Sequence, residues 1–292
     1  MGQIQYSTLP DRGLLKISGA DKRDFLQGLI SNDITRVTPE QAIYAALLTP
    51  QGKYLFDFFI LELNGDLFLD CDAARVDDLT KRLTLYKLRA DVALENISKD
   101  WCVAAIWGDD AREDMGLPVE PGIAKAWAGG VVYVDPRLAA TGLRTILPAP
   151  MIADIAYEKV TAEDYDSHRL SLGLPDGSRD LIQEKSILME SGFDDLNGID
   201  WQKGCYMGQE LTARTKYRGL VKKRLIPVNI DGVLPAPGTA IIANGKEVGE
   251  IRSGAHHRAL ALVRLEHVND ATASLTAGDS TIIPDTPDWA NF

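Results

Sequence analysis

Apolar residues in the first third of the chain recur with two different spacings. Side chains at 25, 26, 29 and 30 recur at helical spacing and predict a helix over residues 21–30. A longer helix is predicted over residues 72–88. Short apolar runs bounded by Gly, Pro, Asn or Asp predict strands. These runs cover residues 14–18, 42–48, 54–63 and 67–70, with turns at 49–52 and 64–66.

The remainder of the chain is dominated by short apolar runs. Two strands are predicted at 101–107 and 129–135, and a helix at 162–172, before a loop-rich stretch at 176–202. From residue 225 onward, apolar runs alternate with Gly, Pro and Asn turns. They lie at 225–230, 240–243, 248–253 and 260–264. Strands this short and this closely spaced predict a small antiparallel barrel.

Composition places the chain among ordinary globular proteins. Its 292 residues suit two or three domains, with 45% hydrophobic and 25% charged residues. Apolar runs long enough to span a membrane are absent from the sequence. Residues 1–12 resemble neither a secretory signal nor an Arg-rich transit peptide, so we expect a cytoplasmic protein without membrane contact. The net charge of −11 disfavours nonspecific polyanion binding, so nucleic-acid contact would have to be local.

Three cysteines, at 71, 102 and 205, are scattered along the chain. That count argues against a disulfide framework and against a zinc or iron–sulfur site built by one chain, and it fits a reduced compartment. Cys71 and Cys102 lie in apolar, strand-like runs, where we expect core packing. The four histidines have no metal-ligand spacing, and no P-loop or dinucleotide fingerprint is present.

Cys205 lies in a different setting, between Gly204 and Tyr206. Glycines let the backbone turn tightly and let a ligand approach it closely. A thiol reacts as the thiolate, which Lys203, Arg214 or backbone N–H groups could stabilise. A small residue filling space in a loop would leave the same pattern, so the residues alone leave packing and chemistry both open.

Asp57 interrupts the apolar run 55–60. A carboxylate is costly to bury unpaired. Strand alternation puts Phe56 and Phe58 on one face and Asp57 on the other, together with Leu55 and Phe59. An Asp on an apolar face either points to solvent or serves a site.

A basic stretch runs from Arg214 to Arg224, where six of eleven residues are Lys or Arg and none is acidic. Such a stretch can hold phosphates, nucleic acid or a polycarboxylate tail. A solvated face that joins two domains would look the same. Tyr217 within it could stack on a base or a pteridine ring.

One motif resembles a known family. It is Lys203-Gly204-Cys205-Tyr206-Met207-Gly208-Gln209-Glu210, followed by Ala213-Arg214 and Arg218-Gly219. The motif is similar to the hallmark of the YgfZ-type folate-binding family, which is related to the glycine-cleavage T protein, an aminomethyltransferase. Further matches lie at residues 17–21, 25–28, 32–33, 48–53 and 249–253. The resemblance covers most of the chain and is weakest over 95–160.

The resemblance implies an α+β, T-protein-like multidomain fold around a central channel, with a C-terminal antiparallel β-barrel. A folate-binding region would span residues 1–220 and the barrel residues 221–292. The folate-binding region would consist of two interleaved α+β parts, one made of 1–45 with 150–220 and the other of 46–149.

The resemblance also implies tetrahydrofolate or another reduced folate as cofactor. Cys205 and Asp57 would be the catalytic residues. Folate would contact Asp57, Tyr165, Lys203, Gly204, Tyr206, Gln209, Glu210 and Arg214. This chain has Phe56-Asp57 where the T protein typically has paired Asp residues, and the T protein has no cysteine in the loop that corresponds to Cys205. Arg12 lies near the place of an N-terminal aromatic contact that some relatives have.

Three functions follow as hypotheses. The resemblance implies a folate-binding protein that supports iron–sulfur protein assembly or repair and, through such enzymes, tRNA modification. Its partners would be iron–sulfur proteins or their assembly factors. The alternative is a folate-dependent aminomethyltransferase, which rests on Asp57 and the shared scaffold. The third hypothesis is a noncatalytic module that docks on RNA or a partner through residues 214–224. The acidic net charge disfavours it.

Overall fold

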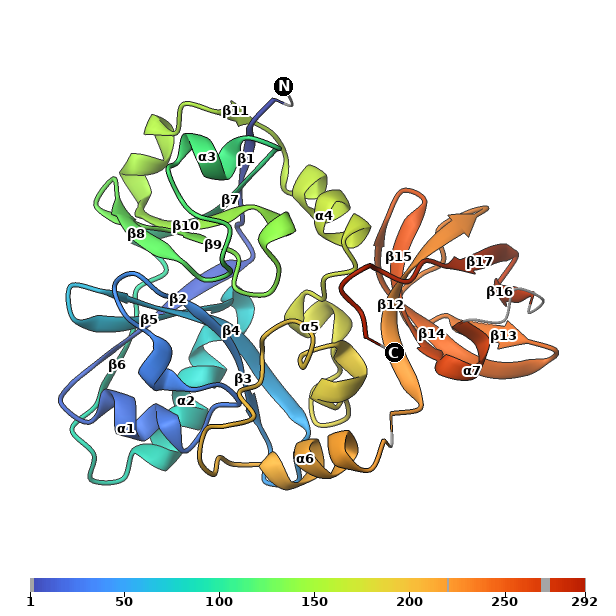
Figure 1. Cartoon of the computed structure of the whole chain (residues 1–292), viewed down its shortest axis with the longest axis horizontal. Coiled ribbons are helices and arrows are strands. Elements are labelled where there is room, and N and C mark those ends of the chain that lie inside the picture. The colour runs from blue at the N-terminus through green and yellow to red at the C-terminus, as the bar shows by residue number, and fades with distance from the viewer. Residues whose placement is uncertain (1–2, 220, 269–273, 292) are drawn as a thin grey trace. The chain divides into compact units, whose positions relative to one another are not determined.

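The computed structural model describes residues 3–219, 221–268 and 274–291 (Figure 1). Its contacts divide the chain into two compact units, each of which takes three segments of the sequence. Unit 1 consists of Met1–Leu48, Leu55–Ala162 and Leu196–Met207. Unit 2 consists of Thr49–Tyr54, Glu163–Asp195 and Gly208–Phe292. Cys205 therefore belongs to unit 1, and the domain boundaries given above stay a prediction.

Unit 1 contains a five-stranded sheet in the order β3-β4-β5-β2-β6. Its strands are β2 (Arg12–Ser18), β3 (Ile43–Leu48), β4 (Tyr54–Leu63), β5 (Asp66–Asp72) and β6 (Ala93–Asn96). The hairpin between β4 and β5 turns at Asn64 and Gly65, whose φ angles of 52° and 81° need residues that tolerate the left-handed region. The predicted turn at 64–66 is therefore confirmed.

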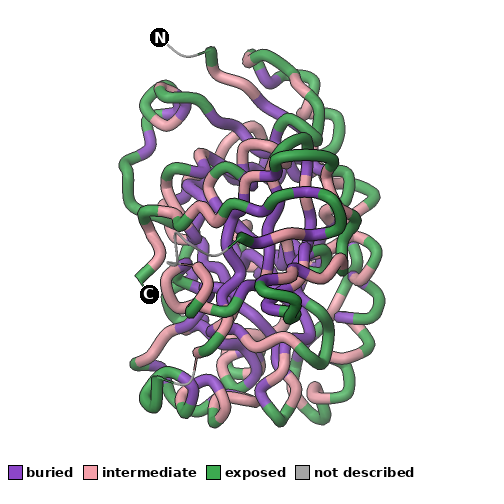
Figure 2. Tube along the Cα trace, turned by 90° about the vertical axis from the view of Figure 1, so that its right-hand side faces the viewer, coloured by how far each residue is buried: buried purple, intermediate pink, exposed green. Residues whose placement is uncertain are grey.

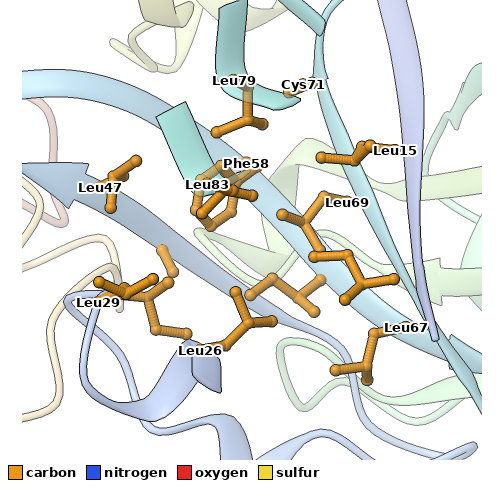
Figure 3. Packing of buried hydrophobic residues seen from close by; sticks show 14 of the residues in the cluster. Leu15, Leu26, Leu29, Leu47, Phe58, Leu67, Leu69, Cys71, Leu79 and Leu83 are labelled. Carbon is orange, nitrogen blue, oxygen red and sulfur yellow. The ribbon is translucent and has the colours of Figure 1, made fainter. Parts of the chain in front are cut away.

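Helices cover this sheet and close its core. They are α1 (Lys22–Gln27) and α2 (Val76–Lys87), with 3₁₀ turns η1 (Ile34–Arg36) and η2 (Ala73–Arg75). Leu79 and Leu83 of α2 pack with Phe58 and Leu69 of the sheet, and Cys71 lies in the same cluster (Figure 3). Figure 2 draws the buried residues in purple, and many of them belong to the strands. β3 is buried at every position, which explains why β3 and most of β4 are continuous apolar runs.

A second sheet of unit 1 has the order β11-β1-β7-β10-β9-β8. Its strands are β1 (Gln5–Thr8), β7 (Trp101–Trp107), β8 (Ala124–Trp127), β9 (Gly130–Val134), β10 (Leu143–Pro148) and β11 (Glu158–Lys159). The short helix α3 (Ala111–Asp114) and the 3₁₀ turns η3 (Ala139–Thr141) and η4 (Ala149–Asp154) connect them. β7 has the predicted bounds. β10 was not predicted, because buried polar residues, Arg144 and Thr145, interrupt its apolar pattern.

Unit 2 contains a closed six-stranded antiparallel barrel, β12-β15-β14-β13-β16-β17, which confirms the predicted barrel. The strands are β12 (Lys223–Asp231), β13 (Ala240–Ala243), β14 (Lys246–Ala255), β15 (Arg258–Arg264), β16 (Leu275–Ala277) and β17 (Ser280–Pro284). Inward residues such as Ile226, Val228 and Ile230 alternate along β12 and fill the interior.

The remaining helices of the chain are short. They are α4 (Ala162–Ser171), α5 (Gly177–Asp180), η5 (Leu188–Ser191), α6 (Gln209–Tyr217) and α7 (Leu265–Val268). Among the described residues, no helix combines the length and the apolar composition that crossing a bilayer requires. The mixed sheets, helices and barrel confirm the predicted α+β class, and the central channel stays a prediction.

Candidate functional site

The loop that carries Cys205 is held to unit 1 by a buried lysine. Lys203 Nζ donates to the backbone carbonyls of Gln27, Ile30 and Asn32 at 2.8, 2.7 and 2.8 Å. Lys203 is 8% exposed. Burial lowers its pKa to about 8, and Asp33 and Asp200 oppose that shift only in part. Three carbonyl acceptors engage all three N–H donors of an ammonium group. Lys203 therefore holds the loop, and its predicted contact with folate stays a prediction.

Asp200 orders the backbone just before this lysine. Its Oδ1 accepts the N–H groups of Gln202 and Lys203 at 2.7 and 2.9 Å, as a carboxylate does in an Asx turn. Its own N–H donates to the carbonyl of Ser31 at 3.1 Å. Ser31 Oγ in turn donates to the carbonyl of Gly198 at 2.6 Å. The chain is thus fixed over several residues before Cys205.

The loop is also tied on the far side of the cysteine. The N–H of Met207 donates to the carbonyl of Gly28 at 3.0 Å. Before the cysteine, Asn32 Nδ2 donates to the carbonyl of Asn197 and also to that of Tyr44 on β3, both at 2.8 Å. Cys205 therefore lies between two anchored points of unit 1, both attached to the segment that follows α1.

The three thiols differ in access. Burial raises the pKa of Cys71 to about 12, which makes its thiolate negligible at neutral pH. Burial also raises the pKa of the half-buried Cys102. Cys205 is exposed, whereas Cys71 lies in the core. The expected packing role is confirmed for Cys71, whereas Cys102 is only partly buried, and Cys205 is the most accessible of the three thiols.

Replacing Lys203 by methionine should loosen this loop. Buried carbonyls of Ile30 and Asn32 would lose their donor, which we expect to cost about 3 kcal/mol of unfolding free energy. Urea unfolding measures that loss, and hydrogen exchange of the amides at 198–207 should accelerate. Lys99→Met changes an exposed lysine and serves as the control. Unchanged exchange in Lys203→Met would show that Lys203 does not hold the loop.

Asp57 occupies a buried position on β4, where it is 7% exposed. Its Oδ2 accepts a hydrogen bond from Tyr44 Oη at 2.8 Å, across from β3. The structure therefore excludes the solvent-facing alternative for Asp57. A paired, buried carboxylate next to a phenol can accept or hold a proton at a ligand.

Three arginines surround Phe59, the next residue on the same face of β4. The guanidinium carbons of Arg12, Arg137 and Arg144 lie 5.7, 4.9 and 4.1 Å from its ring centroid. Asp70 on β5 pairs with both Arg12 and Arg144 at 2.6 Å. Because Arg144 comes from β10, this buried cluster joins the two sheets of unit 1. Arg12 is part of this cluster between the sheets. Some relatives have an aromatic contact near its position.

Unit 2 contains a small polar cavity that the sequence interpretation missed. It is lined by Asp180, Ser186, Glu190, Ser191, Leu225, Arg252 and Leu262. Burial raises the pKa of Glu190, and Lys223, Lys53, Arg224 and Arg252 oppose that shift. Arg252 Nε is buried without a hydrogen-bond partner among the described residues. The match at residues 249–253 was the one sequence signal that included Arg252.

The predicted folate contacts divide between the two units. Tyr206 is buried in unit 1, with Lys203 Nζ 5.1 Å from its ring centroid, and Gly204 is exposed there. Tyr165 belongs to unit 2, where it is buried on α4. Three further residues lie on α6 of unit 2, one half-buried and two exposed: Gln209, Glu210 and Arg214. Their roles toward folate stay predictions.

The basic stretch is less continuous than its sequence suggests. Arg224 is buried and pairs with Asp194 at 3.1 Å, so it is removed from any basic surface. Arg214, Lys216 and Arg218 are exposed on or just after α6. Leu220 lies outside the described residues. Local polyanion contact stays a prediction that rests on the exposed members.

Known families match both halves of the chain. Residues 10–117 match the GCVT N-terminal domain, and residues 222–292 match the CAF17 C-terminal beta-barrel domain. The solved structure of glycine cleavage system aminomethyltransferase T from Bartonella henselae superposes with a TM-score of 0.79 over 99% of this chain and 86% of that chain. At 15% identity, that similarity shows the fold.

Relatives with known names are similar over nearly the whole chain. The mitochondrial iron–sulfur cluster assembly factor IBA57 of Mus musculus is 31% identical, over 96% of this chain and 84% of that protein. The IBA57 homolog of Mycosarcoma maydis is 32% identical over 90% of this chain and 74% of that protein. Because both are named as mitochondrial, the predicted cytoplasmic location is wrong. The composition of residues 1–12, on which that prediction rested, does not determine location.

The resemblance stated from the motif is thus confirmed at the level of the T-protein-like scaffold, with its matching N-terminal and barrel domains. Membership of the YgfZ-type branch in particular stays a prediction. At the identity and coverage of its named relatives, the chain belongs to the IBA57 family of T-protein-like proteins.

Proposed function

We propose that this protein is an iron–sulfur cluster assembly factor that binds a reduced folate and uses Cys205 as its reactive group. One observation carries the proposal: the exposed thiol of Cys205 lies on a loop braced by Lys203, Asp200 and Met207. The names of the IBA57 relatives support the assembly role.

An exposed, braced thiol suits sulfur chemistry. Thiolates are strong nucleophiles and soft ligands, and reactive cysteines are accessible while structural ones are buried. Fixing the backbone on both sides limits the positions the thiol can adopt, which lowers the entropic cost of meeting a reactant. The partners would be iron–sulfur proteins or other assembly factors. Effects on tRNA modification would follow indirectly, through iron–sulfur enzymes.

A buried carboxylate of unit 1 supports a folate as the ligand. The cavity of unit 2 beside Glu190 and Arg252 is about the size of one water molecule, so we do not assign the folate ring to it. Unit 1 offers the buried carboxylate of Asp57, positioned by Tyr44. Asp57 would contact the cofactor. When bound, a reduced folate supplies a one-carbon carrier.

A second function is favoured by Asp57 itself. If the activity is enzymatic, a carboxylate kept buried and hydrogen-bonded to Tyr44 suits proton handling in a folate-dependent aminomethyl transfer. Purified protein given an aminomethyl-lipoyl carrier and tetrahydrofolate would then form methylenetetrahydrofolate. Absence of that product would exclude the transferase and leave the assembly role intact.

Folate binding gives a direct test. We expect the purified protein to bind tetrahydrofolate, and Asp57→Asn to weaken binding at least about tenfold, because it removes the charge of the carboxylate that would contact the ligand. Isothermal titration measures the affinities. Glu184→Gln alters an exposed carboxyl and should change nothing. Failure of the unmodified protein to bind any reduced folate would remove folate from the proposal.

A further inference from the structure

The C-terminal end of α2 exposes apolar side chains that its own core does not use. Val76, Leu79 and Leu83 of this helix are buried in unit 1. Leu85 is 69% exposed and Leu88, which follows the helix, is 89% exposed. Single exposed leucines are ordinary on protein surfaces. Two of them one turn apart, at one helix end, form a small apolar surface.

The backbone at Leu88 makes this exposure unusual. Leu88 caps the helix with φ 48° and ψ −108°, a position where glycine is the usual residue. A leucine with positive φ costs conformational energy. Burial of the side chain in its own unit does not offset that cost, because Leu88 is almost fully exposed. Departures from local sequence rules of this kind are concentrated at functional sites.

Charge reinforces the pattern. Residues 79–90 contain four basic residues and no acidic one, in a chain of net charge −11. Lys81 and Arg82 lie four and three positions before Leu85, so they flank it on the helix surface. Lys81 Nζ lies 3.4 Å from Asp78 Oδ1, and both side chains are exposed. An ion pair so exposed to solvent contributes little to stability. For Arg82, Lys87 and Arg89, the described residues include no ion-pair partner.

We propose that this surface docks an acidic segment of a partner protein that carries apolar side chains. The docking surface consists of Lys81, Arg82, Leu85, Lys87, Leu88 and Arg89. The leucines would supply the desolvated centre of the contact, and the cations a rim that attracts acidic residues. The inference does not depend on Cys205 or on folate.

Two other classes of partner fit less well. Nucleic acid would meet an overall charge of −11, and phosphates make no use of Leu85 or Leu88. An anionic membrane surface needs a helix whose whole apolar face is free. The apolar face of α2 is already buried in its own unit, which leaves two leucines for a bilayer.

Peptide binding tests the surface. The probe is a synthetic helical peptide with a Leu stripe flanked by Glu, labelled for fluorescence anisotropy and titrated with the full chain. We expect binding that weakens as salt is raised, and about tenfold weaker binding in Leu85→Ser/Leu88→Ser and in Lys87→Glu/Arg89→Glu. Val233→Ser and Lys246→Glu alter exposed barrel residues and should bind as the unmodified chain does.

A second variant separates folding from binding. Leu88→Gly should raise the urea midpoint of unfolding, because glycine accepts a positive φ angle. The same change should weaken binding of the peptide, because it removes the leucine side chain. The proposal is overturned if the peptide does not bind or if the two double surface variants and the two barrel controls bind alike. It is also overturned if an RNA oligonucleotide or anionic vesicles bind more tightly than the peptide and respond to the same variants.

Discussion

Replacing Cys205 by serine should abolish the ability of the chain to restore iron–sulfur enzyme activity in cells that lack it. Serine retains the size of the side chain but loses the nucleophilic, soft sulfur. Because Cys205 is exposed and its loop is held by Lys203 and Met207, the fold should be unaffected. Urea unfolding of the purified variant should therefore match that of the unmodified protein. The measurement is the activity of iron–sulfur enzymes in complemented cells.

The other cysteines provide matched controls. Cys102→Ser changes a half-buried thiol and should leave complementation intact. Cys71→Ser places a hydroxyl in the apolar core and should lower stability without a specific loss of function. If Cys205→Ser complemented fully, the assembly mechanism through Cys205 would be abandoned. Folate binding would then be tested on its own.

Replacing Asp70 by asparagine should lower the free energy of unfolding by about 4 kcal/mol, because it removes the buried carboxylate that pairs with the guanidinium groups of Arg12 and Arg144. Asp70 is fully buried and pairs with Arg12 and Arg144 from different sheets. Urea unfolding measures the loss. Asp66→Asn, which affects the part-exposed contact with Lys16 at 3.7 Å, should cost under about 1 kcal/mol. Equal losses in the two variants would contradict this account of the joint between the sheets.

The same carboxylate gives a pH dependence. Burial alone would raise the pKa of Asp70, but Arg12 and Arg144 more than offset it, so the pKa is lowered. A lowered pKa contributes stability that is fully present above the unfolded value of about 4 and is lost as the pH falls through the folded value. Asp70→Asn should therefore flatten the decline of stability in acid. Unfolding curves from neutral to acid pH compare the two proteins.

Strands that are marked by a continuous apolar run between turn residues were predicted well from the sequence. β4, β7 and β13 have the predicted bounds, because continuous apolar runs between turn residues leave little choice of secondary structure. The helix expected over 72–88 begins instead at Val76. Asp72 accepts the N–H of Ala74 and forms a 3₁₀ turn before it. β1 was missed, since its four residues carry little apolar signal.

The candidate site was predicted in part. Asp57 stood out because a carboxylate in an apolar strand needs a reason, but its partner Tyr44 could not be inferred without the pairing of β3 with β4. Lys203 shows more clearly which contacts a sequence does not reveal. Its acceptors lie 171 to 176 positions earlier in the chain, so no local pattern indicates that it braces a loop. Contacts of that range depend on the finished fold.

The discontinuity of unit 1 has a consequence for synthesis. Leu196–Met207 returns to unit 1 only after the chain has passed through the Glu163–Asp195 segment of unit 2. During translation the two sheets can assemble before Lys203 has been synthesised and can donate to the carbonyls of Ile30 and Asn32. Such long-range closure is slow compared with local folding. We therefore expect the thiol of Cys205 to reach its braced position late, after the sheets that support it have formed.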